Sequence, residues 1–169
     1  TFNCDTSDYN TMVSVVYAIL NAIAKDLNIE RRDIKACLSQ KMINNKLQYS
    51  VIIYDAVPGG AGHSRRLVTK DGKMLYAILM SALRNMEQCN CDPSCYNCLR
   101  SYENQKIHDQ LDRKLAAEFL KQFEGEINVI EKLKDEYKKK LKVTNKNSSI
   151  KSETYDDIFD EFGNDEVVI

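Results

Sequence analysis

Four of the six cysteines in the 169-residue chain lie within ten consecutive residues, and this cluster constrains the fold more than any other feature. The spacing is Cys-x-Cys-x3-Cys-x2-Cys, formed by Cys89, Cys91, Cys95 and Cys98. A stretch this short keeps the four thiols within reach of one another whatever the local backbone does. Four thiolates in one loop suit tetrahedral zinc, and a ligand set made only of cysteines is typical of a closed structural site, because catalytic zinc keeps one position open for water.

Two other interpretations of the cluster remain open. An iron–sulfur cluster uses the same four-cysteine ligation, although the spacing is not one of the usual ferredoxin patterns. The four residues could also be free buried thiols, but free cysteines are normally scattered along a sequence, as Cys4 and Cys37 are here. Zinc is therefore the predicted cofactor.

The composition predicts one folded domain. Hydrophobic residues make up 43% of the chain and charged residues 29%, which excludes collagen-like, low-complexity and wholly disordered proteins. The formal net charge is −1, so any binding of nucleic acid has to be local. With no membrane span and no signal peptide, we expect a cytoplasmic protein. Because the chain opens at Thr1 and not Met, we expect either processing or, as the favoured interpretation, a piece of a longer protein.

Hydrophobic periodicity predicts three helices and a small sheet. The helices are expected at residues 8–27, 74–86 and 111–123, where apolar residues recur with a period of about 3.6. Strands are expected at 33–38, which alternates, and at 46–57, whose Val-Ile-Ile-Tyr run is typical of a strand buried on both faces. We predict an α+β fold with this second strand at its centre, covered by three or more helices, and with zinc near the start of the third helix.

The composition changes near residue 143, which is the predicted end of the zinc-binding domain. Residues 144–169 are expected to form a linker and then an acidic tail that is either disordered or docks on a partner. The lysine-rich stretch 131–142 is interpreted as a further helix. The charge is basic in residues 132–151 and acidic from residue 152 onward. The acidic tail is therefore also a candidate to compete with phosphates for the basic face.

A glycine-rich loop follows the second strand. Such a loop can present backbone N–H groups to a phosphate, and nearby arginines can add charge. The candidate phosphate or nucleic-acid contacts are Gly59, Gly60, Gly62, Arg65 and Arg66. A tight connection between a strand and a helix is the favoured interpretation, since the loop is not a Walker A motif and loose glycine patterns are weak evidence.

Asp55, at the end of this strand, has two interpretations. It can cap the turn that follows, or it can serve with His63 and the glycine loop in a small metalloenzyme or phosphodiesterase. We expect His63 and His108 to be structural, because neither lies in a metal-binding or triad spacing. After the cysteine cluster, Asp112 and Arg113 are expected to tie the metal loop to the third helix by charge-assisted hydrogen bonds.

Three ordered motifs together resemble the MrfA-type zinc-binding domain: YDAVPGGAG at residues 54–62, CNCDPSCYNCL at 89–99 and YENQKIHDQLDR at 102–113. This family, long catalogued as a domain of unknown function, occurs at the C-terminus of DEAD/DEAH-type superfamily 2 helicases, including the mitomycin-repair helicases. It also occurs in the DrmB subunit of the DISARM antiphage system.

The resemblance implies that the four clustered cysteines bind structural zinc. It also implies that a set of polar residues belongs to the structural motif around them: Asp55, Asn104, Gln105, His108, Asp112 and Arg113. The chain has no Walker A or DExH sequence, so it cannot be the motor. The implied role is a non-catalytic bacterial module for DNA repair or antiphage defence. It would dock on helicase domains in cis or on a helicase partner subunit. There it would help shape the path of the nucleic acid, and DNA is a candidate partner.

Overall fold

The structure is a computed structural model that describes residues 6–57, 59–69 and 72–125. Its elements, in chain order, are α1 (Tyr9–Asp26), a 3-10 helix η1 (Arg31–Asp33), β1 (Ile34–Ile43), β2 (Lys46–Asp55), α2 (His63–Leu67), α3 (Lys73–Gln88), a 3-10 helix η2 (Gln105–Gln110) and α4 (Arg113–Lys121). The fold is α+β, as predicted. The helix expected at 131–142, the linker and tail after residue 143, and Cys4 lie outside the described residues, and the domain boundary at 143 stays a prediction.

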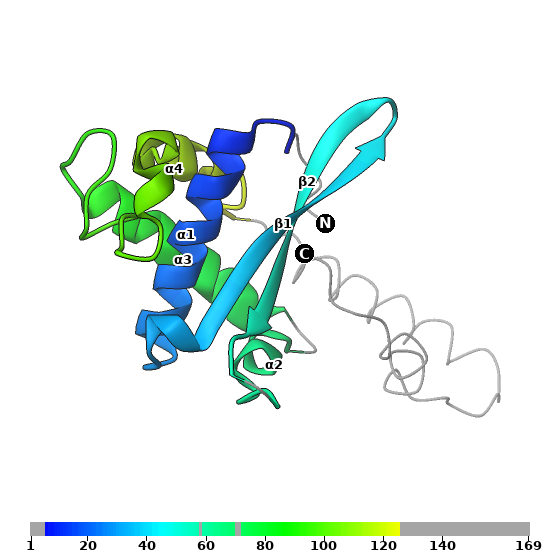
Figure 1. Cartoon of the computed structure of the whole chain (residues 1–169), viewed down its shortest axis with the longest axis vertical. Helices are drawn as coiled ribbons and strands as arrows, with labels where there is room; N and C mark the ends of the chain where they lie inside the picture. Colours follow the sequence, from blue (N-terminus) through cyan, green and yellow to red (C-terminus); the bar gives the residue numbers. More distant parts are fainter. Residues whose placement is uncertain (1–5, 58, 70–71, 126–169) are drawn as a thin grey trace, which may run out of the picture. The chain divides into compact units, whose positions relative to one another are not determined.

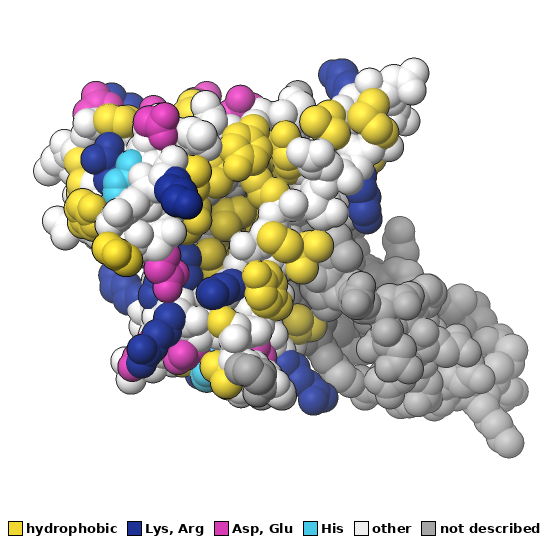
Figure 2. Space-filling view, in the orientation of Figure 1, with side chains coloured by type: hydrophobic (Ala, Val, Ile, Leu, Met, Phe, Trp, Pro, Cys, Tyr) yellow, Lys and Arg dark blue, Asp and Glu magenta, His cyan; other side chains and the backbone are white. Residues whose placement is uncertain are grey.

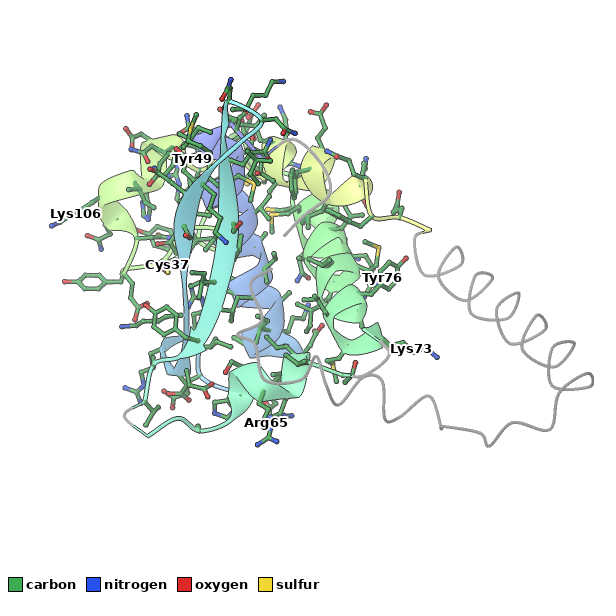
Figure 3. The ribbon with its side chains drawn as sticks, turned by 90° about the vertical axis from the view of Figure 1, so that its right-hand side faces the viewer. Cys37, Tyr49, Arg65, Lys73, Tyr76 and Lys106 are labelled. Carbon is green, nitrogen blue, oxygen red and sulfur yellow. The ribbon has the colours of Figure 1, made fainter. Side chains whose placement is uncertain are left out.

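Helix α1 is the centre of the packing. It contacts α3 and α4, which also contact each other, and the β1–β2 hairpin lies against it (Figures 1 and 3). Met12, Val15 and Ile23 are fully buried, because neighbours cover several sides of this helix. Asp8 caps it by accepting a hydrogen bond from the Thr11 N–H at 2.6 Å. None of the helices in the described ranges is long and apolar enough to cross a membrane.

The sheet is a two-stranded antiparallel hairpin. Its register runs from Ile34 opposite Asp55 to Ile43 opposite Lys46, and Asn44 and Asn45 form the turn with φ values of 51° and 60°. Positive φ at both turn positions matches the right-handed twist of the strands. The first strand extends five residues beyond the predicted end at Leu38. The sequence does not show this extension, because apolar alternation weakens after that residue.

The prediction of a central strand buried on both faces is wrong for β2. This strand pairs only with β1 in the described sheet, and although Val51 is fully buried, Ile53 is half-buried and Tyr54 is 43% exposed. β-branched and aromatic residues also suit a pleated surface that is only half covered. A short apolar run therefore does not distinguish a central strand from one strand of a hairpin.

Candidate metal centre

The loop between α3 and η2 brings the four clustered cysteines together. Their sulfur atoms all lie within 4.8 Å of one another. The Sγ of Cys89 is 3.4 Å from that of Cys91 and 3.5 Å from that of Cys95, and the Sγ atoms of Cys91 and Cys98 are 3.5 Å apart. Tetrahedral zinc with bonds of about 2.3 Å holds its sulfurs roughly 3.8 Å apart. The cluster thus has the size of a site for one ion, whereas an iron–sulfur cluster places its thiolates on different irons.

A tight turn fixes the last two cysteines. The carbonyl oxygen of Cys95 accepts hydrogen bonds from the backbone N–H groups of Cys98, Leu99 and Arg100 at 3.0–3.1 Å. In return, the N–H of Cys95 donates to the Sγ of Cys98 at 3.1 Å. Leu99 is fully buried, so the turn is anchored in the hydrophobic core directly beside the sulfurs.

The thiols in the cluster differ in acidity. Burial and hydrogen bonding with the neighbouring cysteines raise the pKa of Cys91. Burial also acts to raise the pKa of Cys95, but a backbone hydrogen bond from Asn97 and hydrogen bonds with the other three thiols hold it at about 7. Cysteine binds metal as the thiolate, so the lowered pKa of Cys95 favours metal binding near neutral pH.

The start of α4 holds the other side of the loop. Arg113 donates from Nε to the carbonyl oxygen of Cys91 at 2.6 Å and from Nη1 to that of Met86 at 3.2 Å. Its backbone N–H donates to the Pro93 carbonyl at 2.9 Å, and Asp112 caps α4 by accepting from the Lys114 N–H at 2.7 Å. The arginine thus joins the end of α3, the metal loop and the start of α4.

Comparison with known proteins assigns the family. Residues 15–99, half of the chain, match the model of the MrfA Zn-binding domain, and this range contains all four clustered cysteines. The chain belongs to the MrfA Zn-binding (MZB) family. Zinc is therefore its cofactor, and among the described residues these cysteines form the group that can hold a metal ion.

The MZB domain also has a named relative. It is similar to Druantia protein DruE of Escherichia coli (strain UMEA 4076-1), with 39% identity over 71 residues. The similar region covers 42% of this chain and 4% of the relative, so the chain spans only a small part of that protein's length. No solved structure matches.

Asn104 braces the chain that leaves the metal loop. It is 2% exposed; its Oδ1 accepts from the Ser101 N–H at 2.7 Å, and its Nδ2 donates to the Leu99 carbonyl at 2.9 Å. The Nε2 atom of His108 lies 2.8 Å from this Oδ1 and 3.0 Å from the carbonyl oxygen of Ser101. Both of these atoms are acceptors, so Nε2 carries the hydrogen and His108 is a structural donor in the MZB domain. Gln105, in contrast, is exposed.

Two residues of α1 that the sequence interpretation missed also hold the metal loop. Asn21 donates from Nδ2 to the carbonyl oxygen of Cys98 at 2.7 Å and accepts from the Nε of Arg31 at 3.0 Å. Ser14, which is fully buried, accepts from the Asp112 N–H at 3.0 Å. The signal in the sequence was two polar residues seven positions apart, which share one face of an otherwise apolar helix.

The glycine loop of the MZB domain folds around Asp55. The two carboxylate oxygens of this residue accept from the N–H groups of Gly62 and Ser64, both at 2.9 Å. Gly59, Gly60 and Gly62 have φ values of 85°, 69° and 76°, which side chains rarely tolerate. With both oxygens occupied by backbone, Asp55 has the geometry of a turn cap, the structural interpretation of the two.

Arg65 and Arg66 follow this loop, but the hydrogen bonds to the Asp55 carboxylate come from Gly62 and Ser64. Arg65 and Arg66 are exposed on the short helix α2, and the Arg65 side chain points away from the fold (Figure 3). His63 begins the same helix, and its Nδ1 is buried without a hydrogen-bond partner. The structure therefore gathers the predicted loop residues into one connection between β2 and α3, with Arg65 and Arg66 on its surface.

The Asp55 cap predicts a pH-dependent stability. Burial acts to raise the pKa of Asp55, but the hydrogen bonds from Ser64 and Gly62 lower it below its ordinary value. The stabilisation from a carboxyl with a lowered pKa is complete above the unfolded value of about 3.9 and is lost as the pH falls through the folded value. Asp55→Asn keeps one acceptor of two, so we expect it to lower the free energy of unfolding at pH 7 by about 1–2 kcal/mol.

Denaturant unfolding of both proteins across a pH series measures this effect. The difference between wild type and Asp55→Asn should shrink below pH of about 4. Asp109→Asn, which changes an exposed carboxylate, is the control and should match wild type at every pH. A constant difference over the whole series would show that the charge of Asp55 does not stabilise the loop.

Proposed function

We propose that this MZB domain is a non-catalytic structural module of a helicase or of a helicase-associated antiphage defence complex. In this proposal Cys89, Cys91, Cys95 and Cys98 are the zinc ligands. The observation that carries it is the cluster of four sulfurs, held by α3, α4 and α1 through backbone and partly buried side-chain contacts. Bound zinc cross-links four points of the loop, which is a structural and not a catalytic use of the metal.

The helicase and defence context is supported by two likenesses. One is membership of the MrfA Zn-binding domain family. The other is the similarity to Druantia protein DruE, where the similar region makes up 4% of that protein. We infer that the present chain works in the same kind of setting, beside ATP-driven helicase domains in cis or on a partner subunit in the bacterial cytoplasm. There it would support movement along DNA by docking, without hydrolysing ATP itself.

The metal is tested by elemental analysis of protein purified without added metal, with an absorption spectrum of the same sample. We expect about one zinc per chain and no visible absorbance, because four thiolates complete one tetrahedral site. Iron with visible bands would contradict the proposal and indicate an iron–sulfur protein.

The docking role is tested in the complete protein or complex that contains this domain. Disrupting the domain with Cys95→Ser should leave ATP hydrolysis by the motor domains largely intact, but lower the unwinding of forked DNA severalfold. Lost coupling between hydrolysis and movement is the expected signature of a missing docking module. Equal unwinding by the variant and the wild type would contradict this role.

A further inference from the structure

Among the residues that the structure describes, none pairs its backbone with one edge of the hairpin beyond the start of β1. In an antiparallel pair, hydrogen-bonded residue pairs alternate with pairs whose N–H and C=O groups point outward. The bond from the Ala56 N–H to the Asp33 carbonyl, at 2.8 Å, makes Asp33–Ala56 a hydrogen-bonded pair and so sets the alternation. It follows that the backbone groups of five β1 residues point away from β2: Ile34, Ala36, Leu38, Gln40 and Met42.

Two contacts agree with this assignment. The N–H of Tyr49 points out of the opposite edge, where it donates to the Thr6 carbonyl at 3.2 Å. The outward carbonyl of Ile34, at the start of β1, accepts from Arg31 at 2.9 Å. Beyond that point, no backbone group within 6–57, 59–69 or 72–125 pairs with the outer edge of β1.

A groove lies beside the first residues of this edge. It has a volume of about 500 Å³ and is lined by Tyr17 and Leu20 of α1, by Lys35 and Ala36 of β1, and by Tyr102 after the metal loop. Figure 2 shows hydrophobic side chains gathered in the middle of the face it draws, between the hairpin and the rest of the domain. The start of β1 is therefore one wall of a partly apolar groove.

The charge of the groove is positive. Arg31 lies at its end, with its guanidinium 5.8 Å from the centre of the Tyr17 ring, and Lys35 is exposed beside it. Glu103 is the acidic residue among those that line the groove. A segment that fits here would carry an acidic side chain at the Arg31 end and apolar side chains towards α1.

The hairpin also exposes apolar side chains on one face, which a third strand would extend. Met42 and Leu47 are opposite each other near the turn, on the same face as Val51, and are 67% and 39% exposed. A hairpin of two strands has little stability of its own, and a third strand extends both the ladder and its apolar face. An unpaired edge of this length is a template for another strand.

We propose that the β1 edge and its groove form a strand-addition site, which takes an extended apolar segment with an acidic residue from the helicase part of the assembly. The alternating row of backbone N–H and C=O groups is the pattern that pairs with another extended peptide. Lys35 and Lys41 on the edge strand are of the kind that discourages pairing with a second copy. The identity of the assembly rests on the proposed function, whereas peptide binding does not.

Amide hydrogen exchange of the zinc-loaded chain, measured by NMR, tests the site directly. In the chain alone, the amides of Ala36, Leu38 and Gln40 should exchange fast, while those of Cys37 and Ser39 are protected by the ladder. The probe is a short peptide of alternating valine and threonine that begins with glutamate, added at about 1 mM to detect even weak association. We expect it to slow exchange at the three outward amides about tenfold or more, with no change in α3.

A matched pair of variants locates the peptide. Gln40→Pro removes an outward N–H from the β1 edge, and Leu47→Pro removes one from the β2 edge; proline is tolerated at such edge positions. We expect the first to weaken peptide binding about tenfold and the second to leave it unchanged. Zinc content and melting temperature establish that both variants are folded.

Two results would overturn the inference. One is the absence of protection at the outward amides with the peptide at about 1 mM. The other is protection by an oligothymidylate of equal length in place of the peptide, which would make the groove a nucleic-acid site. Either result leaves the zinc content and the unwinding experiment untouched, so the proposed function stands or fails separately.

Discussion

Cys95→Ser is expected to remove zinc from the domain and to unfold much of it. The binding free energy of structural zinc, about 10–16 kcal/mol in small peptides, acts largely as folding free energy. A domain of this size has only about 5–15 kcal/mol of stability in total. Losing one of four ligands should therefore lower the melting temperature by roughly 15 °C or more, since 1 kcal/mol corresponds to about 4–8 °C in a small domain.

Cys37→Ser is the matched control for this prediction. Cys37 is an exposed cysteine on β1 (Figure 3), so the same chemical change there should leave zinc content and melting temperature as in wild type. Calorimetry and elemental analysis on the three proteins measure both quantities. Cys95→Ser with unchanged melting would refute a structural role for the metal.

Asn104→Ala is expected to have the second largest effect. The substitution removes the acceptor for the Ser101 N–H and the donor for the Leu99 carbonyl, and Leu99 itself is fully buried. Each buried group left without a partner costs about 1–3 kcal/mol. We expect the free energy of unfolding of the zinc-loaded domain to fall by about 2–4 kcal/mol in urea titrations.

Gln105→Ala provides the comparison for this variant. Gln105 is the next residue but is exposed, so its truncation should change the free energy of unfolding by less than about 0.5 kcal/mol. Similar effects of the two substitutions would mean that the contacts of Asn104 do not hold the chain after the metal loop.

The group of four cysteines was predictable because the residues that form it are close neighbours in the sequence. Four cysteines in ten residues meet whatever the rest of the chain does, and the turn from Asn44 to Asn45 is likewise fixed by neighbouring residues. The helices were predictable for a related reason, because the apolar periodicity of each is visible within a few helical turns of sequence. These features need no knowledge of distant contacts.

The contacts that hold the cluster in place were not predictable. Asn21 and the carbonyl of Cys98 are 77 residues apart in the chain, and Ser14 and Asp112 are 98 apart. The sequence shows a polar residue on an apolar face but not which distant group will meet it. The wrong placement of β2 at the centre of the sheet has the same origin, because the number of neighbouring strands depends on the whole fold.

The two hydrogen bonds of Asn21 have a mechanical consequence. Arg31, at the base of β1, donates to Asn21, and Asn21 donates to the carbonyl of the metal-loop residue Cys98. A force on the residues before β1 would therefore be carried through one α1 side chain to the loop that holds the four cysteines. A loop whose four thiolates share one ion resists displacement more than the same loop without it, so zinc would stiffen the Cys98 end of this connection.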